Sequence, residues 1–246
     1  MQTIDLNCDL GEGFKNDALL MDYITSANIA CGYHAGNAAI MQQTVALAYK
    51  KGVAIGAHPG FNDAANFGRT EINLSPAEVY RITYGQISTL AFFVKDKGGA
   101  LHHVKPHGAL YNMAAKSIPL AEAIARAVFD FDPSLIIYGL AGSEMITAAA
   151  KLGLKTASEI FADRTYQNDG SLTPRSQNNA LITNETQMTT QVLQMIKQGQ
   201  VKTVNQNTIG IKAETLCLHG DGRHAVEFAR MIHKRLTAEG IVIEAV

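Results

Sequence analysis

Short apolar runs alternate with longer amphipathic segments along the whole chain. The apolar runs, such as residues 4–10, 27–31 and 53–58, have the length and composition of strands, and the longer segments have helical spacing. We count seven strand–helix units and find no linker between them, so we expect one domain over residues 1–246. Strict βα alternation predicts a parallel sheet, which must be closed into a barrel or covered by helices on both faces.

Several element boundaries carry local signals. Asn37 is placed to cap a helix that stops at Gly52, and the run 75–78 reads as a capping box that opens a helix ending near residues 98–99. Further helices are predicted at about 17–24, 118–129 and 184–199, and a small β excursion at 201–212. The long polar loop 61–73, which carries Arg69, is expected to cover a site.

The stretch 100–112 is the clearest case of a strand that ends in reactive side chains. Residues 100–104 are compatible with a short strand, and Lys105, Pro106, His107 and Gly108 follow at once. Proline has no N–H for a sheet ladder, and glycine permits backbone shapes that a Cβ would block. Lys105 and His107 are therefore expected just past a strand's end, although a surface turn would explain this stretch taken alone.

The same pattern recurs after the other strands. The ionisable residues in question are Asp9, Glu12, His34, His58, Glu159, Asp163, His219 and Asp221. Each has an ordinary structural explanation by itself, such as a turn or a helix cap. In a barrel, however, the carboxyl ends of all strands meet at one rim, so the repetition favours a closed barrel with a shared site.

Composition narrows the classes of function. The chain is 47% hydrophobic and 17% charged with a net charge of -1, which argues against binding to nucleic acid or to membrane surfaces. No apolar run reaches membrane-spanning length and the first residues lack signal-peptide features, so a cytoplasmic location is expected. The three cysteines lack CxxC spacing and are expected to be reduced and buried as small hydrophobic residues.

The motifs at 5–13, 27–36, 56–60, 103–112, 161–164 and 219–221 resemble those of the 5-oxoprolinase A-subunit family, also called the lactam-utilisation family. The resemblance covers essentially the whole chain. It implies a TIM-like (βα) barrel of the glycoside hydrolase/deacetylase type, seven-stranded and irregular. It also implies ATP-dependent hydrolysis of 5-oxo-L-proline to L-glutamate, with ATP as cosubstrate and 5-oxoprolinase subunits B and C as partners. Asn37 departs from the family pattern, which usually has aspartate there.

Catalytic roles are expected to be drawn from Asp9, Glu12, His34, His58, Lys105, His107, Glu159, Asp163, His219 and Asp221. Substrate or phosphate is expected at Arg69, Arg164, Gly220 and Gly222. Lys105 or Arg164 would hold phosphate charge. The chain has no GxxxxGK[ST] loop, so ATP is either bound without that motif or handled by the partners.

Two glycine loops are candidates for phosphate binding, 139–143 and 219–222, and the second is preferred because barrels often bind phosphate at their final loops. Two other functions remain open. A metal-dependent deacetylase or amidase would use His34, His58, His219 and Asp9 as ligands, although no local HxxxH or HExxH pair supports it. The chain could also be a non-catalytic subunit that binds the lactam.

Overall fold

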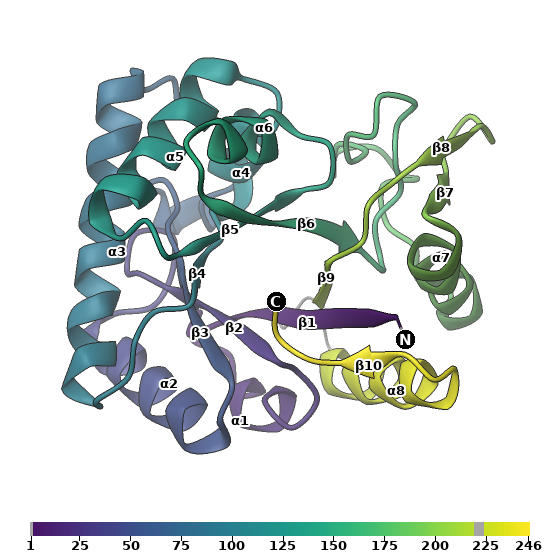
Figure 1. The fold of residues 1–246 in the computed structure, drawn as a ribbon, viewed down its shortest axis with the longest axis horizontal. Helices are drawn as coiled ribbons and strands as arrows, with labels where there is room; N and C mark the ends of the chain where they lie inside the picture. Colours follow the sequence, from purple (N-terminus) through teal and green to yellow (C-terminus); the bar gives the residue numbers. More distant parts are fainter. Residues whose placement is uncertain (1, 219–223) are drawn as a thin grey trace.

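The computed structural model of the chain describes residues 2–218 and 224–246 and contains a closed parallel barrel (Figure 1). Its strands are β1 (Thr3–Leu10), β2 (Ser26–Ala30), β3 (Ala54–His58), β4 (His103–Val104), β5 (Ile136–Leu140), β6 (Lys155–Phe161) and β9 (Thr215–Leu218). They pair in that order, and β9 also pairs with β1 to close the ring. The predicted seven-stranded barrel is confirmed, while the single domain expected over residues 1–246 stays a prediction.

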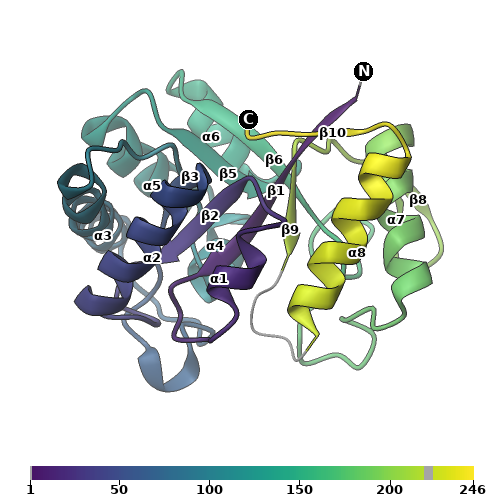
Figure 2. The same ribbon diagram turned by 90° about the horizontal axis from the view of Figure 1, so that it is seen from below.

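The helices surround this barrel, and Figure 2 shows α8 beside α7 on one side and α2, α3 and α5 on the other. The long helices are α2 (Ala38–Lys51), α3 (Pro76–Asp96), α5 (Ile118–Phe131), α6 (Glu144–Lys151), α7 (Glu185–Gln198) and α8 (Ala225–Ala238). The Asn37 side chain accepts from Ile40 N, Gly52 ends α2 with φ 69°, and Ser75 with Glu78 forms the predicted capping box. These three boundary predictions are confirmed.

Some elements differ from the prediction in length or in kind. The helix expected at 17–24 is only the turn α1 (Asp17–Leu20), and β4 has two residues instead of the expected five. Helix α4 (Gly108–Ala114), for which no element was predicted, begins at a glycine with φ 54°. A Cβ at Gly108 would lie 2.6 Å from the carbonyl oxygen of Gly68, so the close approach of the 61–73 loop requires glycine there.

Three short strands in the described part of the chain lie outside the barrel ring. Strand β10 (Val242–Ile243), which was not predicted, pairs in parallel with the start of β1 outside the ring. The predicted β excursion is confirmed as the antiparallel pair β7 (Gln200–Lys202) and β8 (Thr208–Gly210).

A one-turn 3-10 helix, η1 (Ala64–Asn66), lies in the long loop 61–73. Among the described residues, no helix is long and apolar enough to cross a membrane.

Candidate functional site

A buried ammonium group lies where β4 ends. Lys105 is 2% exposed, and its Nζ lies 2.9 Å from Asp9 Oδ1, 2.8 Å from Glu159 Oε1 and 3.0 Å from Asn7 Oδ1. Burial alone would lower the pKa of Lys105, but Asp9, Cys217 and Glu159 raise it well above its usual value. Lys105 is therefore charged, and its three protons are committed to neighbours within the barrel.

A network of neutral side chains supports this ion cluster. Asn7 Nδ2 donates to Glu159 Oε1 at 3.0 Å and to Thr215 Oγ1 at 2.7 Å. Asn28 Nδ2 donates to Asn7 Oδ1 at 2.7 Å and to Asp9 Oδ1 at 2.9 Å. The sequence reasoning missed Asn7, Asn28 and Thr215. The available signal was that Asn7 and Asn28 each interrupt an apolar strand, where an amide needs buried partners.

Glu159 belongs to this support layer. It lies inside β6, not just past a strand's end as predicted, and its side chain is completely buried. Tyr111, also missed, donates its hydroxyl proton to Glu159 Oε2 at 2.6 Å. Burial and the Glu159 carboxylate raise the pKa of Tyr111 well above its usual value, so the phenol keeps its proton. Glu159 thus positions Lys105 and Tyr111 from behind.

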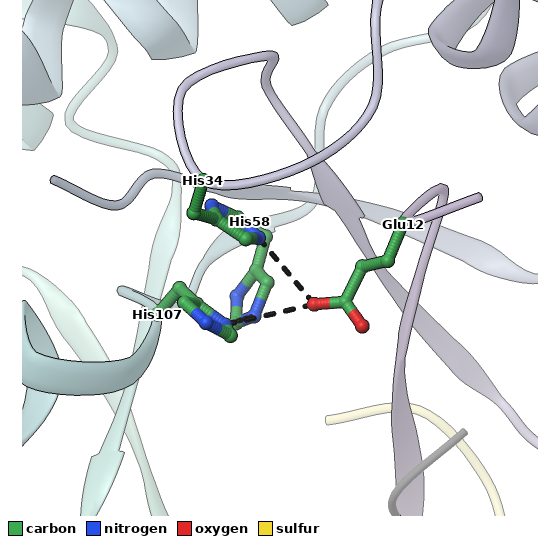
Figure 3. A group of neighbouring side chains, drawn as sticks. All are labelled: Glu12, His34, His58 and His107. Carbon is green, nitrogen blue, oxygen red and sulfur yellow. Dashed lines mark hydrogen bonds and ion pairs between the residues drawn. The ribbon is translucent and has the colours of Figure 1, made fainter. Parts of the chain in front are cut away.

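Three imidazoles and a carboxylate meet beside the ion cluster (Figure 3), and we call His34, His58, His107 and Glu12 the histidine cluster. The rings of His34 and His107 stack with centroids 3.8 Å apart. Glu12 Oε1 lies 3.4 Å from His34 Nε2 and 3.6 Å from His107 Nδ1. Burial and the neighbouring His58 lower the pKa of His107 to about 3, and burial also lowers that of His34, so both rings are neutral.

An open pocket of about 490 Å³ lies against both clusters. The predicted residues that line it are Asp9, Glu12, His58, Arg69, Lys105, His107 and Arg164. The structure therefore brings together residues from the ends of β1, β3, β4 and β6. Of the other predicted residues that the structure describes, His34 and Glu159 lie behind the lining, and Asp163 is not part of it.

Arg164 places a cation in the lining of this pocket. It is 4% exposed, its Nη2 donates to Thr173 O at 2.6 Å, and its Nε has no hydrogen-bond partner among the described residues. Burial, with a smaller effect of Arg175, lowers the pKa of Arg164 to about 10, which leaves the guanidinium charged at neutral pH. A charged donor in a pocket can hold a carboxylate or a phosphate.

The remaining predictions fall partly outside the described residues. His219, Gly220, Asp221 and Gly222 belong to the segment 219–223, so the preferred phosphate loop is not described. In the other loop, Gly139 and Leu140 belong to β5, and only Leu140 lines the pocket. Of the ligand set expected for a deacetylase, His34 and His58 meet His107 and Glu12, while Asp9 Oδ2 lies 3.4 Å from His58 Nε2.

All three cysteines are free and buried, as expected. One of them is more than a small hydrophobic residue, because Cys217 Sγ lies 3.1 Å from Lys105 Nζ. Burial raises the pKa of the Cys217 thiol well above its usual value, which keeps the sulfur protonated and weakly nucleophilic. Cys217 therefore completes the surroundings of Lys105 on the β9 side.

The LamB/YcsF family matches residues 4–246. The 5-oxoprolinase A subunit from Geobacillus kaustophilus is 56% identical over 100% of this chain and 97% of its own length. The crystal structure of the lactam utilization protein from Thermus thermophilus is 40% identical, with a TM-score of 0.93 over 99% of this chain and 100% of that one. The chain therefore belongs to the LamB/YcsF family, and the predicted family resemblance is confirmed.

A more distant likeness concerns the fold alone. A family 4 carbohydrate esterase from Streptomyces lividans is 12% identical, with a TM-score of 0.50 over 100% of this chain and 93% of that one. The barrel thus has the deacetylase-type architecture that the sequence predicted. At this identity the likeness says nothing about substrate or catalytic residues.

Proposed function

We propose that this chain is the A subunit of an ATP-dependent 5-oxoprolinase, which opens the lactam ring of 5-oxo-L-proline to give L-glutamate while ATP is converted to ADP and phosphate. The named relative that matches over the full length supports the substrate and the role within a complex. The observation that carries the chemistry is the pocket whose lining includes Asp9, Lys105 and Arg164. Subunits B and C as partners and a cytoplasmic location belong to the same proposal.

Opening a lactam requires a base for water, a donor for the developing oxyanion and a proton for the ring nitrogen. Asp9 is placed to act as the base. Lys105 Nζ and Asn28 Nδ2 fix its Oδ1 at 2.9 Å each, and the side chain lines the pocket. Water would give a proton to Asp9 as its oxygen bonds to the ring carbonyl carbon. Asp9 would then return that proton to the ring nitrogen as the carbon–nitrogen bond breaks.

Lys105 has a positioning role in this scheme. Its protons are already shared among Asn7, Asp9 and Glu159, so it has little capacity to act as a nucleophile or to donate a proton. Its charge offsets the two carboxylates beside it and allows both to stay buried. Lys105 therefore keeps Asp9 in one orientation and adds positive potential where negative charge develops on the substrate oxygen.

The pocket also suits an anionic substrate. Arg164 and Arg69 both line it, and a guanidinium binds a carboxylate or a phosphate through paired hydrogen bonds. 5-Oxoproline carries one carboxylate, and transfer of the terminal phosphoryl group of ATP to its amide oxygen, with release of ADP, would add a second anion and activate the ring carbon for water. Breaking the carbon–nitrogen bond after this water adds would leave an acyl phosphate, which a second water would cleave to glutamate and phosphate. Because the chain has no GxxxxGK[ST] motif, we assign nucleotide binding mainly to the partner subunits.

The test is glutamate release from 5-oxoproline with ATP, measured with this chain alone, with subunits B and C alone, and with all three together. We expect turnover only in the complete mixture, with ADP formed in proportion to glutamate. The Asp9→Asn variant should lower kcat at least about 100-fold, in the range typical of a lost general base. Asp22→Asn, on an exposed pair with Lys51, is the matched control. Full turnover without this chain, or unchanged kcat in Asp9→Asn, would contradict the proposal.

A further inference from the structure

Two backbone carbonyls fix the tautomers of two histidines in the histidine cluster. His58 Nδ1 lies 2.7 Å from Lys105 O, and His107 Nε2 lies 2.9 Å from Phe67 O. A carbonyl oxygen only accepts, so each of these ring nitrogens must carry the proton. In the neutral rings, His58 Nε2 and His107 Nδ1 are therefore both left with a lone pair.

These two lone pairs face each other. His107 Nδ1 and His58 Nε2 are 2.9 Å apart, yet neither nitrogen has a proton to donate while both rings are neutral. Such an approach is stable only with a positive centre between or beside the two nitrogens. A proton on one of the two rings is the first candidate, but it would satisfy only this pair and would leave both nitrogens of the buried His34 without a hydrogen-bond partner among the described residues. A bound cation is the remaining candidate.

The third histidine and the glutamate approach the same point. His34 is 1% exposed, and neither of its ring nitrogens has a hydrogen-bond partner among the described residues. Its Nδ1 faces the backbone, because a Cβ at Gly60 would lie 2.7 Å from it, while its Nε2 lies 3.4 Å from Glu12 Oε1. Leaving both nitrogens of a buried imidazole unsatisfied is costly unless a ligand uses one of them.

The spacing of these atoms suits a small coordination sphere. Ligands about 2.0–2.2 Å from a tetrahedral zinc ion lie roughly 3.3–3.6 Å from one another. The separations here include 2.9 Å for His58 with His107, 3.4 Å for His34 with Glu12 and 3.6 Å for His107 with Glu12. One atom from each of the four residues fits within 4.8 Å of every other, so small side-chain movements would complete the sphere.

We propose that His34, His58, His107 and Glu12 bind one divalent transition-metal ion of the zinc class. Imidazole nitrogens and a carboxylate oxygen suit such an ion. The carbonyls of Lys105 and Phe67 act as the outer partners that orient two of the rings, the arrangement that metal-ligating histidines usually have. Because Glu12, His58 and His107 line the pocket, the bound ion borders the space proposed for the lactam.

The first test is binding of zinc to the whole chain after removal of bound metal with a chelator. Isothermal titration with zinc chloride should give one site per chain. At free zinc about 100 times Kd, the unfolding temperature should rise by roughly 5–10 °C. No binding of zinc, cobalt or manganese by the stripped protein would overturn the proposal, whatever the outcome of the glutamate assay, because this test does not involve turnover.

Variants locate the site. His58→Gln and His107→Gln should each weaken zinc binding by more than the 10–100-fold that loss of an outer partner typically costs. The control is His102→Gln, a half-buried histidine outside the cluster, which should bind zinc as the unmodified chain does. Zinc binding that survives both cluster variants, or that is lost in His102→Gln, overturns the assignment. If the cluster variants do not fold, the visible absorption spectrum of cobalt bound to the unmodified chain is the test. A spectrum that shows three nitrogen ligands supports the assignment, and a spectrum without them overturns it.

Discussion

Lys105 shows how one residue can serve both the fold and the site. It lies 2% exposed between Asp9 and Glu159, so its removal would leave two carboxylates without a nearby cation. Because the ammonium group is buried, replacing Lys105 is expected to affect the fold as well as the activity.

We therefore expect Lys105→Met to abolish glutamate release and to lower the free energy of unfolding by about 3–5 kcal/mol. The pKa of Lys105 is raised, so its contribution to stability is present at neutral pH and lost only above about pH 10, as the pH passes the folded-state pKa. Urea unfolding at pH 7 measures the effect. Lys51→Met, on the exposed pair with Asp22, should change stability by less than about 1 kcal/mol. Equal losses in both variants would contradict this account.

The buried imidazole of His103 is expected to make the free energy of unfolding depend on pH. His103 is fully buried, its Nε2 donates to Asn28 Oδ1 at 2.7 Å, and its ring stacks on Tyr138. Burial, with a smaller effect of His102, lowers the pKa of His103 well below its usual value. Below about pH 6.5 the unfolded chain binds a proton there that the native state does not, so stability falls as the pH decreases.

In metal-free protein, this histidine should add a slope of at most about 1.4 kcal/mol per pH unit near pH 5. Comparing urea unfolding of the unmodified chain and of His103→Gln between pH 7.5 and 5 isolates that share. His34 and His107, whose pKa values are also lowered, would keep part of the slope in the variant. A slope that is unchanged in His103→Gln would show that His103 is protonated in the native state.

At the scale of elements, β3 and β4 can pair only because one position lacks a side chain. Gly56 of β3 stands opposite His103 of β4, and a Cβ at Gly56 would lie 2.1 Å from His103 Nε2. The imidazole is held by a hydrogen bond to Asn28 and by stacking on Tyr138, and both contacts oppose its displacement. Because Gly56 has no side chain, β3 and β4 can pair while the imidazole of His103 occupies the space beside Gly56 inside the barrel.

Gly56→Ala should therefore destabilise the protein by about 1–3 kcal/mol or more, as overpacked cores do. Gly85 in α3 provides the matched control. It is exposed, a Cβ there would meet nothing within 4 Å, and Gly85→Ala should gain roughly 0.5–1 kcal/mol in helix propensity. Thermal or urea unfolding of both variants tests the contrast, and a neutral Gly56→Ala would mean that β4 can shift to accept the methyl group.

The N-terminus of α2 explains why the departure at Asn37 matters little. The Asn37 side chain accepts from Ile40 N at 3.0 Å, and Asn37 does not line the pocket. An aspartate caps a helix about as well as an asparagine does, so Asn37→Asp should change stability by less than about 1 kcal/mol and leave turnover unchanged. Steady-state kinetics of the two proteins measures this. A large gain in rate for Asn37→Asp would show that the family's carboxylate has a catalytic role.

For the whole molecule, the barrel was predictable because its signals are local and repeated. Seven apolar runs, each followed by a helical segment, leave few alternatives to a closed parallel ring. Strand β10 and helix α4 were missed for the opposite reason. Val242 and Ile243 gain a strand partner only because the closed ring brings β1 beside them, and Gly108 starts a helix because the loop containing Gly68 packs against it.

The site also contains residues that the sequence could predict and residues that it could not. Lys105, His107 and His58 were found because each follows an apolar strand, whereas Asn7 and Thr215 were missed. Their importance comes from hydrogen bonds between strands that are far apart in the sequence, such as the bond from Asn7 to Thr215. The sequence likewise offered no way to see that Glu12 and His107 meet His34, because the contacts depend on side-chain orientation at the rim. Periodicity identifies the rim, and three-dimensional packing assigns the partners.

The last prediction concerns Arg164, which lines the pocket together with residues of the barrel rim. The pocket lies between the barrel rim, with Asp9 and Lys105, and the segment after β6, where Arg164 bridges to Leu181 and donates to Thr173 O. If Arg164 holds the anionic group of the substrate across this space, it contributes to binding and not to proton transfer.

Arg164→Met should then raise the KM for 5-oxoproline in the complete assay mixture by roughly 10–100-fold, because a hydrogen bond to a charged group contributes about 1.5–3 kcal/mol. The value of kcat should change much less. Arg126→Met is the matched control, since Arg126 lies exposed on α5, pairs with Asp130 and is outside the pocket lining. Circular dichroism should be the same for both variants. A fall in kcat with unchanged KM would instead place Arg164 in the chemical step, and unchanged values of both would remove it from the site.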